Sequence, residues 1–323
     1  MNITESAEVH PAPAVLVRLR LALRDIKLAH SVFALPFAVL AAFLTAPREG
    51  NEGLILWGRF AGMLALIVAC MFFARTWAML VNRVADARID AANPRTAKRA
   101  FAGGGLSRRD GILMLAASAI AFIAGASGFG FAFDNWWPAF LSVPVLIWIG
   151  FYSFTKRFTW WCHVFLGGAL AASPLAAAIA TQGFEAFVLN DAWTNAGTTL
   201  LALAGMVLCW VAGFDVIYAL QDLEYDQEAG LNSIPAKFGW RGAITISRAL
   251  HALSLVCLVI AWRASDQLDS IFGVGVAIVA ATLLYEHTVL AKRGKEGIPM
   301  AFFTLNGVVS CVIGLAGVVD VLV

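Results

Sequence analysis

Two groups of acidic side chains repeat at helical spacing, each at the end of a long apolar stretch. The first group contains Asn82, Asp86 and Asp90, which are four residues apart. If one helix carries them, all three project from one face at steps of roughly 6 Å. Like charges at this spacing destabilise a helix, so a compensating cation is expected. Oxygen side chains of this kind are ligands for divalent cations.

The second group repeats the same spacing later in the chain. Asp222 and Asp226 are four residues apart, with Tyr218 one turn and Asp215 two turns before Asp222. Asp215 therefore lies deeper in the apolar region, where an ionisable side chain is costly and marks a candidate functional residue. Either group alone could be a solvated helix end, but two groups at one depth favour a shared site.

Together these groups have the chemistry of a magnesium–diphosphate site. Mg²⁺ keeps several waters and binds through a few carboxylates plus substrate phosphates. We therefore predict Mg²⁺ as the cofactor, with the ligands Asn82, Asp86, Asp90, Asp222 and Asp226.

Basic residues follow the acidic groups and could bind phosphates. Arginine binds phosphate in a bidentate manner and lysine acts as a point charge. Each of them, taken singly, could instead be an ordinary positive charge beside a membrane. The candidates for diphosphate binding are Arg95, Arg99, Lys156 and Arg157, with Lys237 lying beyond the second acidic group.

The composition places these groups in a membrane protein. Of 323 residues, 60% are hydrophobic and 14% are charged, with a mean hydropathy of +0.79. A soluble domain has roughly 25% charged residues. The five cysteines form no CxxC motif and are interpreted as small buried apolar residues.

The fold class predicted is all-α, a polytopic bundle of nine transmembrane helices, since a span needs about 20 mainly apolar residues. The predicted spans are 28–46, 60–81, 111–133, 137–155, 162–182, 197–219, 243–262, 270–290 and 300–322.

Charge placement predicts the orientation of this bundle. The N-terminal segment and the connections after even-numbered helices hold 18 lysines and arginines, whereas the opposite side holds 2. The positive-inside rule puts the N-terminus in the cytosol and, with nine spans, the C-terminus outside. We expect a cytosolic segment 1–27 and one transmembrane domain, 28–323, in the cell inner (plasma) membrane, with the active site on the cytosolic side.

Two further residues could contact a second substrate. His30 lies at the cytosolic start of the first predicted helix and could either line the site or be structural. Arg75 lies two turns before Asn82 on the same helix face. An arginine that deep should point into the bundle and pair with an acid. It is either a partner of Asp215 or a ligand of an acceptor carboxylate.

At these motifs the chain resembles the UbiA superfamily of membrane prenyltransferases. The family pattern is NxxxDxxxD after helix 2 and a YxxxD-containing DxxxD motif after helix 6, in a nine-helix fold. Asn82, Asp86 and Asp90 match the first motif, and Tyr218, Asp222 and Asp226 match the second. The tail of the first motif is matched by Arg95, Thr96 and Arg99.

The resemblance implies Mg²⁺-dependent transfer of a polyprenyl chain from its diphosphate to an aromatic acceptor, most simply 4-hydroxybenzoate in quinone biosynthesis. The alternative within the family is a naphthoate acceptor in menaquinone synthesis by the futalosine route. Tyr218 could stabilise an allylic cation through its ring, and Asp215 could take a proton or orient the acceptor. The expected partners are these two substrates and the lipid bilayer, without nucleic acid.

Two other classes of protein are compatible with acids inside a membrane. A cation-coupled transporter usually places its acids near the bilayer midplane, on broken helices within inverted repeats. Here the acids cluster at helix ends, and the sequence has no repeat beyond the two DxxxD motifs. A non-catalytic scaffold would leave six aligned polar residues unexplained.

Overall fold

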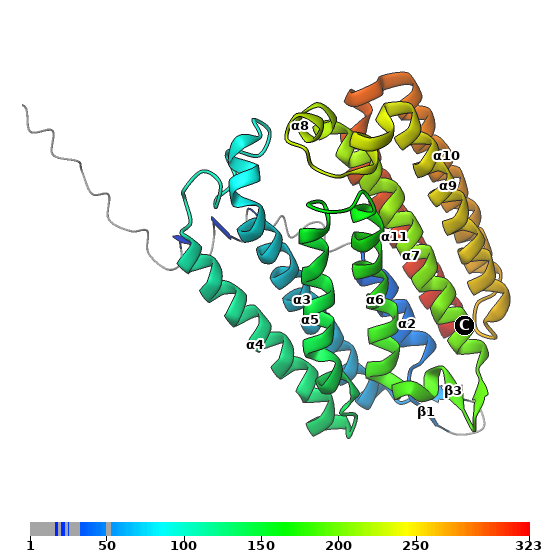
Figure 1. Ribbon diagram of the computed structural model, residues 1–323. Helices are drawn as coiled ribbons and strands as arrows, with labels where there is room; N and C mark the ends of the chain where they lie inside the picture. Colours follow the sequence, from blue (N-terminus) through cyan, green and yellow to red (C-terminus); the bar gives the residue numbers. More distant parts are fainter. Residues whose placement is uncertain (1–16, 19–20, 23–24, 26–32, 50–52) are drawn as a thin grey trace, which may run out of the picture.

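The described chain folds into a bundle of long helices (Figure 1). The structure is a computed structural model that describes residues 17–18, 21–22, 25, 33–49 and 53–323. The main helices are α2 (Leu35–Leu44), α3 (Trp57–Ala92), α4 (Arg108–Phe133), α5 (Trp137–Thr155), α6 (Cys162–Gln182), α7 (Asn195–Ala219), α9 (Ile234–Ala264), α10 (Ser270–Arg293) and α11 (Asn306–Leu322).

Short elements connect these helices. They are the antiparallel hairpins β1 (Arg48–Glu49) with β2 (Leu54–Ile55) and β3 (Val188–Leu189) with β4 (Ala192–Trp193), the short helix α8 (Leu223–Glu228), and the turns η2 (Gly183–Ala186), η3 (Leu220–Asp222), η4 (Gly294–Gly297) and η5 (Met300–Leu305).

The predicted nine-helix bundle is confirmed within the described residues. Eight of the helices are long and apolar enough to cross a membrane, and α2 is a shorter apolar helix. The first predicted span, 28–46, contains α2, while its residues 28–32 lie outside the described part of the chain. Most of the predicted cytosolic segment 1–27 also lies outside it.

Three helices differ most from their predicted bounds, while α4, α7 and α10 differ by two or three residues. α3 has 36 residues, about 54 Å of helix, so it extends well beyond a hydrocarbon core of about 30 Å. α9 begins at Ile234 instead of residue 243, and Gly239, with a φ of 66°, breaks its helical path. The last predicted span begins with η5, a π-helical turn, before α11. Hydropathy locates apolar segments but carries no information on these polar extensions and kinks.

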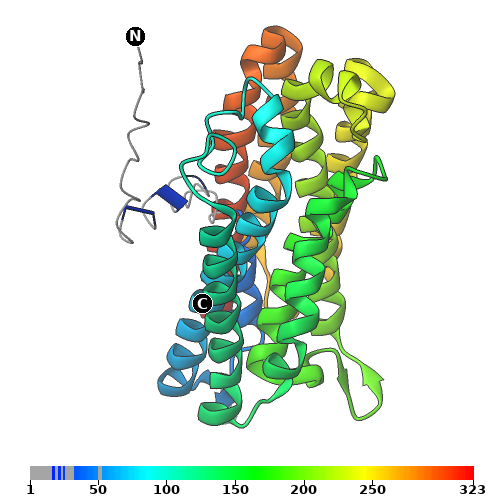
Figure 2. The same ribbon diagram turned by 60° about the vertical axis from the view of Figure 1, so that its left-hand side comes forward.

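Hydrogen bonds show which connections meet at one end of the bundle. The α9–α10 connection contacts both the C-terminal part of α11 and the end of α2. Asp320 accepts hydrogen bonds from the backbone of Asp269 and Phe272, and the Gln267 amide donates to the Leu44 carbonyl. The hairpin β3–β4 lies at this same end (Figures 1 and 2).

The opposite end carries the acidic groups. The Asn232 backbone donates to the Lys156 carbonyl, and the Tyr225 hydroxyl donates to the Ile89 carbonyl at 2.9 Å. The connections after α3, α5 and α7 therefore converge at one end, as the sequence predicts.

The core between the helices is apolar and rich in aromatic side chains. Trp210 is fully buried, and its indole nitrogen donates to the Asn306 side chain at 2.6 Å. Trp210 also packs against Phe33, Phe37 and Phe214. A buried polar side chain needs such a partner, so Asn306 joins α7 to α11 by an interhelical hydrogen bond.

A glycine allows the close approach of α6 and α7. A Cβ atom added to Gly167 would lie 2.3 Å from the Leu208 carbonyl oxygen. Because that atom belongs to the backbone of α7, no side-chain rotation could relieve the overlap. Any larger residue at this position must push the two helices apart.

Candidate functional site

A cavity of about 700 Å³ runs between the helices and contains most of the predicted site residues in its wall. One end is polar and includes Asn82, Asp86 and Asp222. The remaining lining is mostly apolar and includes Phe129 and Leu141. Such a cavity can hold a charged head and an apolar tail in one molecule.

The first acidic group sits on the part of α3 that extends beyond the membrane-spanning stretch. Asp86 has a side chain that is 2% exposed, and it lies between Lys156 Nζ at 2.6 Å and Arg157 at 2.8 Å. The Asn82 amide also donates to Asp86 at 3.1 Å. One turn later, Arg99 contacts both carboxylate oxygens of Asp90 at 2.8 Å.

The second acidic group lies where α7 ends and the chain turns through η3 into α8. Arg95 contacts both carboxylate oxygens of Asp222, with a distance of 2.8 Å from Nε to Oδ1. The Asn93 amide donates to the same Oδ1 atom at 3.0 Å. Burial alone lowers the pKa of Arg95, but the hydrogen bond and charge of Asp222 outweigh it, so the pKa lies above its usual range. Arg95 is therefore a permanent cation held against the second acidic group.

The four cations predicted to bind diphosphate each contact a carboxylate of one of the two acidic groups. Of these, Arg157 contacts Asp86 but is not part of the cavity wall. Lys237 is different, because its ammonium lies 4.2 Å from the centre of the Trp160 ring, in a separate smaller cavity.

The donor set fits a hard divalent cation. Asn82, Asp86, Asp90, Asp222 and Asp226 all line the polar end of the same cavity. Among the described residues, no three His, Cys, Asp or Glu side chains come close enough to form a metal site by themselves. Mg²⁺ does not require such a cage, because phosphates and water complete its coordination.

Tyr218 lies beside the second acidic group, with both its hydroxyl and its ring in contact with neighbours. Arg95 donates to the hydroxyl at 3.2 Å and also lies over the ring. The Phe302 ring is 4.1 Å away, between ring centres. Tyr218 therefore holds Arg95 at the polar end of the cavity.

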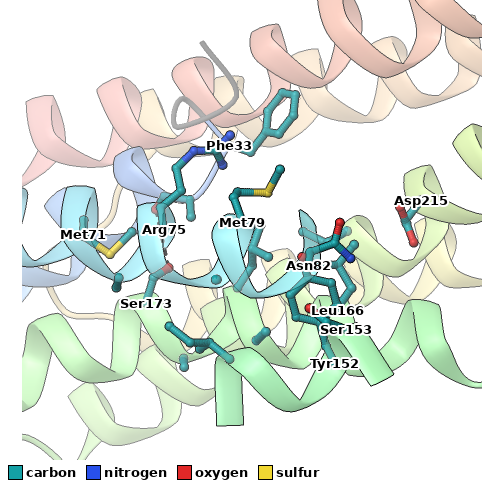
Figure 3. Close-up of a pocket in the computed structure, with 18 of the residues that line it drawn as sticks. Phe33, Met71, Arg75, Met79, Asn82, Tyr152, Ser153, Leu166, Ser173 and Asp215 are labelled. Carbon is teal, nitrogen blue, oxygen red and sulfur yellow. Dashed lines mark hydrogen bonds between the residues drawn. The ribbon is translucent and has the colours of Figure 1, made fainter. Parts of the chain in front are cut away.

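Asp215 lies on α7 in the cavity wall and pairs with a residue that sequence reasoning did not select. His163 Nδ1 is 2.7 Å from Asp215 Oδ2. No ion pair joins Arg75 to Asp215 in the described part of the chain, so the structure does not show the pairing considered for these two. Figure 3 shows Arg75 one turn before Met79 and two turns before Asn82, at a distance along the cavity from Asp215. His30 lies outside the described residues.

Several cavity residues escaped the sequence reasoning. They carry ordinary side chains within helices, where a single polar residue predicts little. Tyr152, four residues before Lys156, and Asn93, two residues before Arg95, could have been found by their spacing from selected cations. Arg83, which donates to the Asn82 side chain at 3.0 Å, and His163 gave no such signal. Figure 3 shows Tyr152 and Ser153 together below Asn82.

Comparison with known proteins agrees with this arrangement. The sequence profile of the UbiA prenyltransferase family matches residues 34–308. The 4-hydroxybenzoate octaprenyltransferase of Pseudomonas syringae pv. tomato is 28% identical over 238 residues, which cover 73% of this chain and 74% of that protein. The enzyme with the same name from Shewanella sediminis is 27% identical over 246 residues, which cover 76% of this chain and 79% of that protein.

Solved structures show the same fold. The apo structure of a UbiA homologue from Aeropyrum pernix has a TM-score of 0.76 and 31% identity, covering 91% of this chain and 98% of the other. A UbiA homologue from Archaeoglobus fulgidus, solved with bound GPP and Mg²⁺, has a TM-score of 0.66 and 19% identity, covering 94% of this chain and all of the other.

The profile covers most of the chain, and the apolar helices are those of an integral membrane protein. The cation-coupled transporter and the non-catalytic scaffold have no support from these matches. The chain is a prenyltransferase and belongs to the UbiA prenyltransferase family.

Proposed function

We propose that this protein transfers a polyprenyl chain from polyprenyl diphosphate to 4-hydroxybenzoate, with Mg²⁺, in quinone biosynthesis. The observation that carries the proposal is the arrangement of acids and cations around the polar end of one long apolar cavity. The names of the relatives support the acceptor, and the GPP and Mg²⁺ bound to the Archaeoglobus homologue support the donor and metal.

The acids hold the metal and the cations hold the diphosphate in this proposal. Asn82, Asp86, Asp90, Asp222 and Asp226 are the proposed Mg²⁺ ligands, and the metal supplies neutralisation of charge on the departing diphosphate. Arg95, Arg99, Lys156 and Arg157 are the proposed phosphate contacts. These cations already contact carboxylates, and both partners are oxyanions, so the same side chains can bind phosphate by similar hydrogen bonds.

The chemistry follows from the charges that develop. The allylic C–O bond breaks as its electron pair moves to the diphosphate, where fixed cations stabilise the new charge. The electron-rich ring then forms a C–C bond to the allylic carbon and loses a proton. Asp215 is the proposed proton acceptor. Tyr218 holds Arg95 in place through its hydroxyl, and its aromatic ring stabilises positive charge on the allylic carbon.

The acceptor lies deeper than the diphosphate in this proposal. Arg75 lines the cavity two turns below Asn82 and is the proposed contact of the acceptor carboxylate. His30 is proposed as a second contact on sequence grounds alone.

Residues 28–323 form one transmembrane domain behind a cytosolic segment 1–27, and the site opens to the cytosolic face of the cell inner membrane.

Prenyl transfer in isolated membranes tests the proposal. The assay contains prenyl diphosphates of mixed length and Mg²⁺, with 4-hydroxybenzoate or dihydroxynaphthoate, and mass spectrometry identifies the product beside an EDTA control. A product from 4-hydroxybenzoate that EDTA abolishes is expected. If only dihydroxynaphthoate gives a product, the acceptor is a naphthoate and not 4-hydroxybenzoate. Activity that persists in EDTA would contradict the assignment of Mg²⁺.

A further inference from the structure

We propose that His163 is a positioning residue that holds the Asp215 carboxylate ready to accept the proton released by the acceptor ring. The inference rests on the proposed function and adds to it a residue that neither the sequence motifs nor the names of the relatives assign.

The hydrogen bonds define the tautomer of His163. Its Nε2 atom accepts from the backbone N–H of Ile234 at 3.3 Å, so Nε2 carries no proton. The proton is then on Nδ1, which donates to Asp215 Oδ2 at 2.7 Å. An imidazole that donates in this way orients the Asp215 carboxylate.

Burial of the His163 side chain restricts the orientation of the Asp215 carboxylate. Both residues line the cavity, but the His163 side chain is 3% exposed and that of Asp215 is 22% exposed. His163, which also lines the cavity, occupies one oxygen of the carboxylate. Among the described residues the second oxygen, Oδ1, has no hydrogen-bond partner and is not a buried unpaired atom, so it is the oxygen left for a molecule in the cavity.

The helices hold the pair at a fixed separation. His163 lies at the start of α6 and Asp215 in the last two turns of α7, while Ile234 is the first residue of α9. Gly167 is four residues after His163, on the same face of α6, and permits close contact with α7. Three packed elements therefore determine where the carboxylate points.

The reaction releases one proton from the acceptor ring, and Asp215 is the proposed acceptor of that proton. Formation of the C–C bond leaves the ring with one hydrogen too many at the reacting carbon. That hydrogen leaves as a proton to Asp215 Oδ1, and the C–H electron pair restores the aromatic ring. The products are prenylated acceptor, diphosphate and a protonated carboxyl, so no oxidant or reductant is needed.

Three substitutions of His163 separate positioning from a structural role. His163→Asn places an amide nitrogen near the Nδ1 position and keeps a donor to Asp215. His163→Gln places its amide near the Nε2 position, so it keeps an acceptor for Ile234 but loses the donor. His163→Leu removes both contacts. Size-exclusion profiles and melting temperatures in detergent identify variants that fold.

The readout is kcat and KM for both substrates in the full-length protein. We expect Asp215→Asn to lower kcat by about 100-fold, as for loss of a general base, and His163→Leu to lower it by about tenfold. His163→Asn should recover most of this loss and His163→Gln should not. The KM for prenyl diphosphate should stay unchanged in all three His163 variants, because His163 contacts none of the proposed phosphate-binding side chains.

A double substitution completes the test. If His163 acts through Asp215, His163→Leu has no further effect on kcat in a protein that already carries Asp215→Asn. Recovery by Gln but not by Asn, or an undiminished effect of His163→Leu in the double variant, would overturn the inference while leaving the proposed function intact. A wild-type protein without transfer to either ring would overturn the proposed function, and this inference with it.

Discussion

At the scale of single residues, the site balances buried negative charge with positive charge. Asp86 is almost fully buried and contacts two cations, and Asp90 and Asp222 each contact one arginine. An unpaired charge in such surroundings would be strongly destabilising. The same pairing keeps cations within reach of a diphosphate that enters the cavity.

The acidic residues of α8 and η3 allow a matched test of this site. We expect Asp222→Asn to lower kcat by about 100-fold, because a metal ligand and the partner of Arg95 are lost together. Glu224→Gln should leave activity unchanged, since the Glu224 side chain is exposed and contacts Lys295 outside the cavity. Steady-state prenyl transfer measures both variants. An equal fall in kcat for the two variants would show that activity requires the total negative charge at this helix end and not Asp222 in particular.

At the scale of elements, the length of α3 and the contact between α6 and α7 decide where functional groups lie. α3 extends past the apolar stretch and so carries Asp86 and Asp90 to the end of the bundle. The α6–α7 contact places His163 against Asp215. Small residues at helix contacts permit this approach in membrane proteins.

Gly167→Ala tests the importance of that helix contact. The added Cβ atom would overlap the Leu208 carbonyl, so the helices must separate at a cost of about 1–3 kcal/mol. Melting temperature in detergent should fall, and kcat should fall with it as His163 moves from Asp215. Gly307→Ala is the control, because outside its own stretch of helix backbone no atom lies within 4 Å of its added Cβ. A Gly167→Ala protein with unchanged melting temperature and kcat would contradict the close packing.

At the scale of the whole molecule, the cavity changes character along its length. The polar end lies among the connections after α3, α5 and α7, and apolar side chains line the path toward the other end. His163 and Ala180 both line it from α6, about 26 Å apart along the helix. This length suits a long apolar chain attached to a charged head.

Ala180→Phe should shorten the prenyl donors that the protein prefers. The larger side chain fills cavity space at the apolar end, so the ratio of kcat/KM for octaprenyl over geranyl diphosphate should fall about tenfold. Leu201→Phe on the exposed surface of α7 is the control and should leave this ratio unchanged. Product analysis by mass spectrometry reads both. An unchanged ratio for Ala180→Phe would place the prenyl tail elsewhere.

The orientation of the bundle gives a further expected outcome. α11 ends beside the α9–α10 connection, at the end of the bundle with few positive charges. Alkaline phosphatase fused after Val323 should therefore be active, whereas green fluorescent protein at the same place should not fluoresce. A fluorescent and phosphatase-negative result would reverse the proposed orientation. A fusion to the 82–110 connection is the matched control and should give the opposite pattern.

The sequence by itself determined the features that depend on neighbours in the chain. Apolar runs of about 20 residues must lie in lipid as helices, so the number and order of the helices could be predicted. The four-residue spacing of Asp86 and Asp90, and of Asp222 and Asp226, follows from the helical repeat. These patterns also sufficed to identify the family, which the profile match confirmed.

Only the tertiary structure decided which side chains meet across the bundle. Arg95 could have faced any acid, but packing directs it to Asp222, 127 residues away. Asp215 pairs with His163 and not with Arg75, because α6 approaches α7 closely at Gly167. Such partners depend on the rotation and separation of helices, which many small packing contacts determine together. Local spacing therefore predicted the groups that do chemistry, whereas helix packing decided how each of them is held.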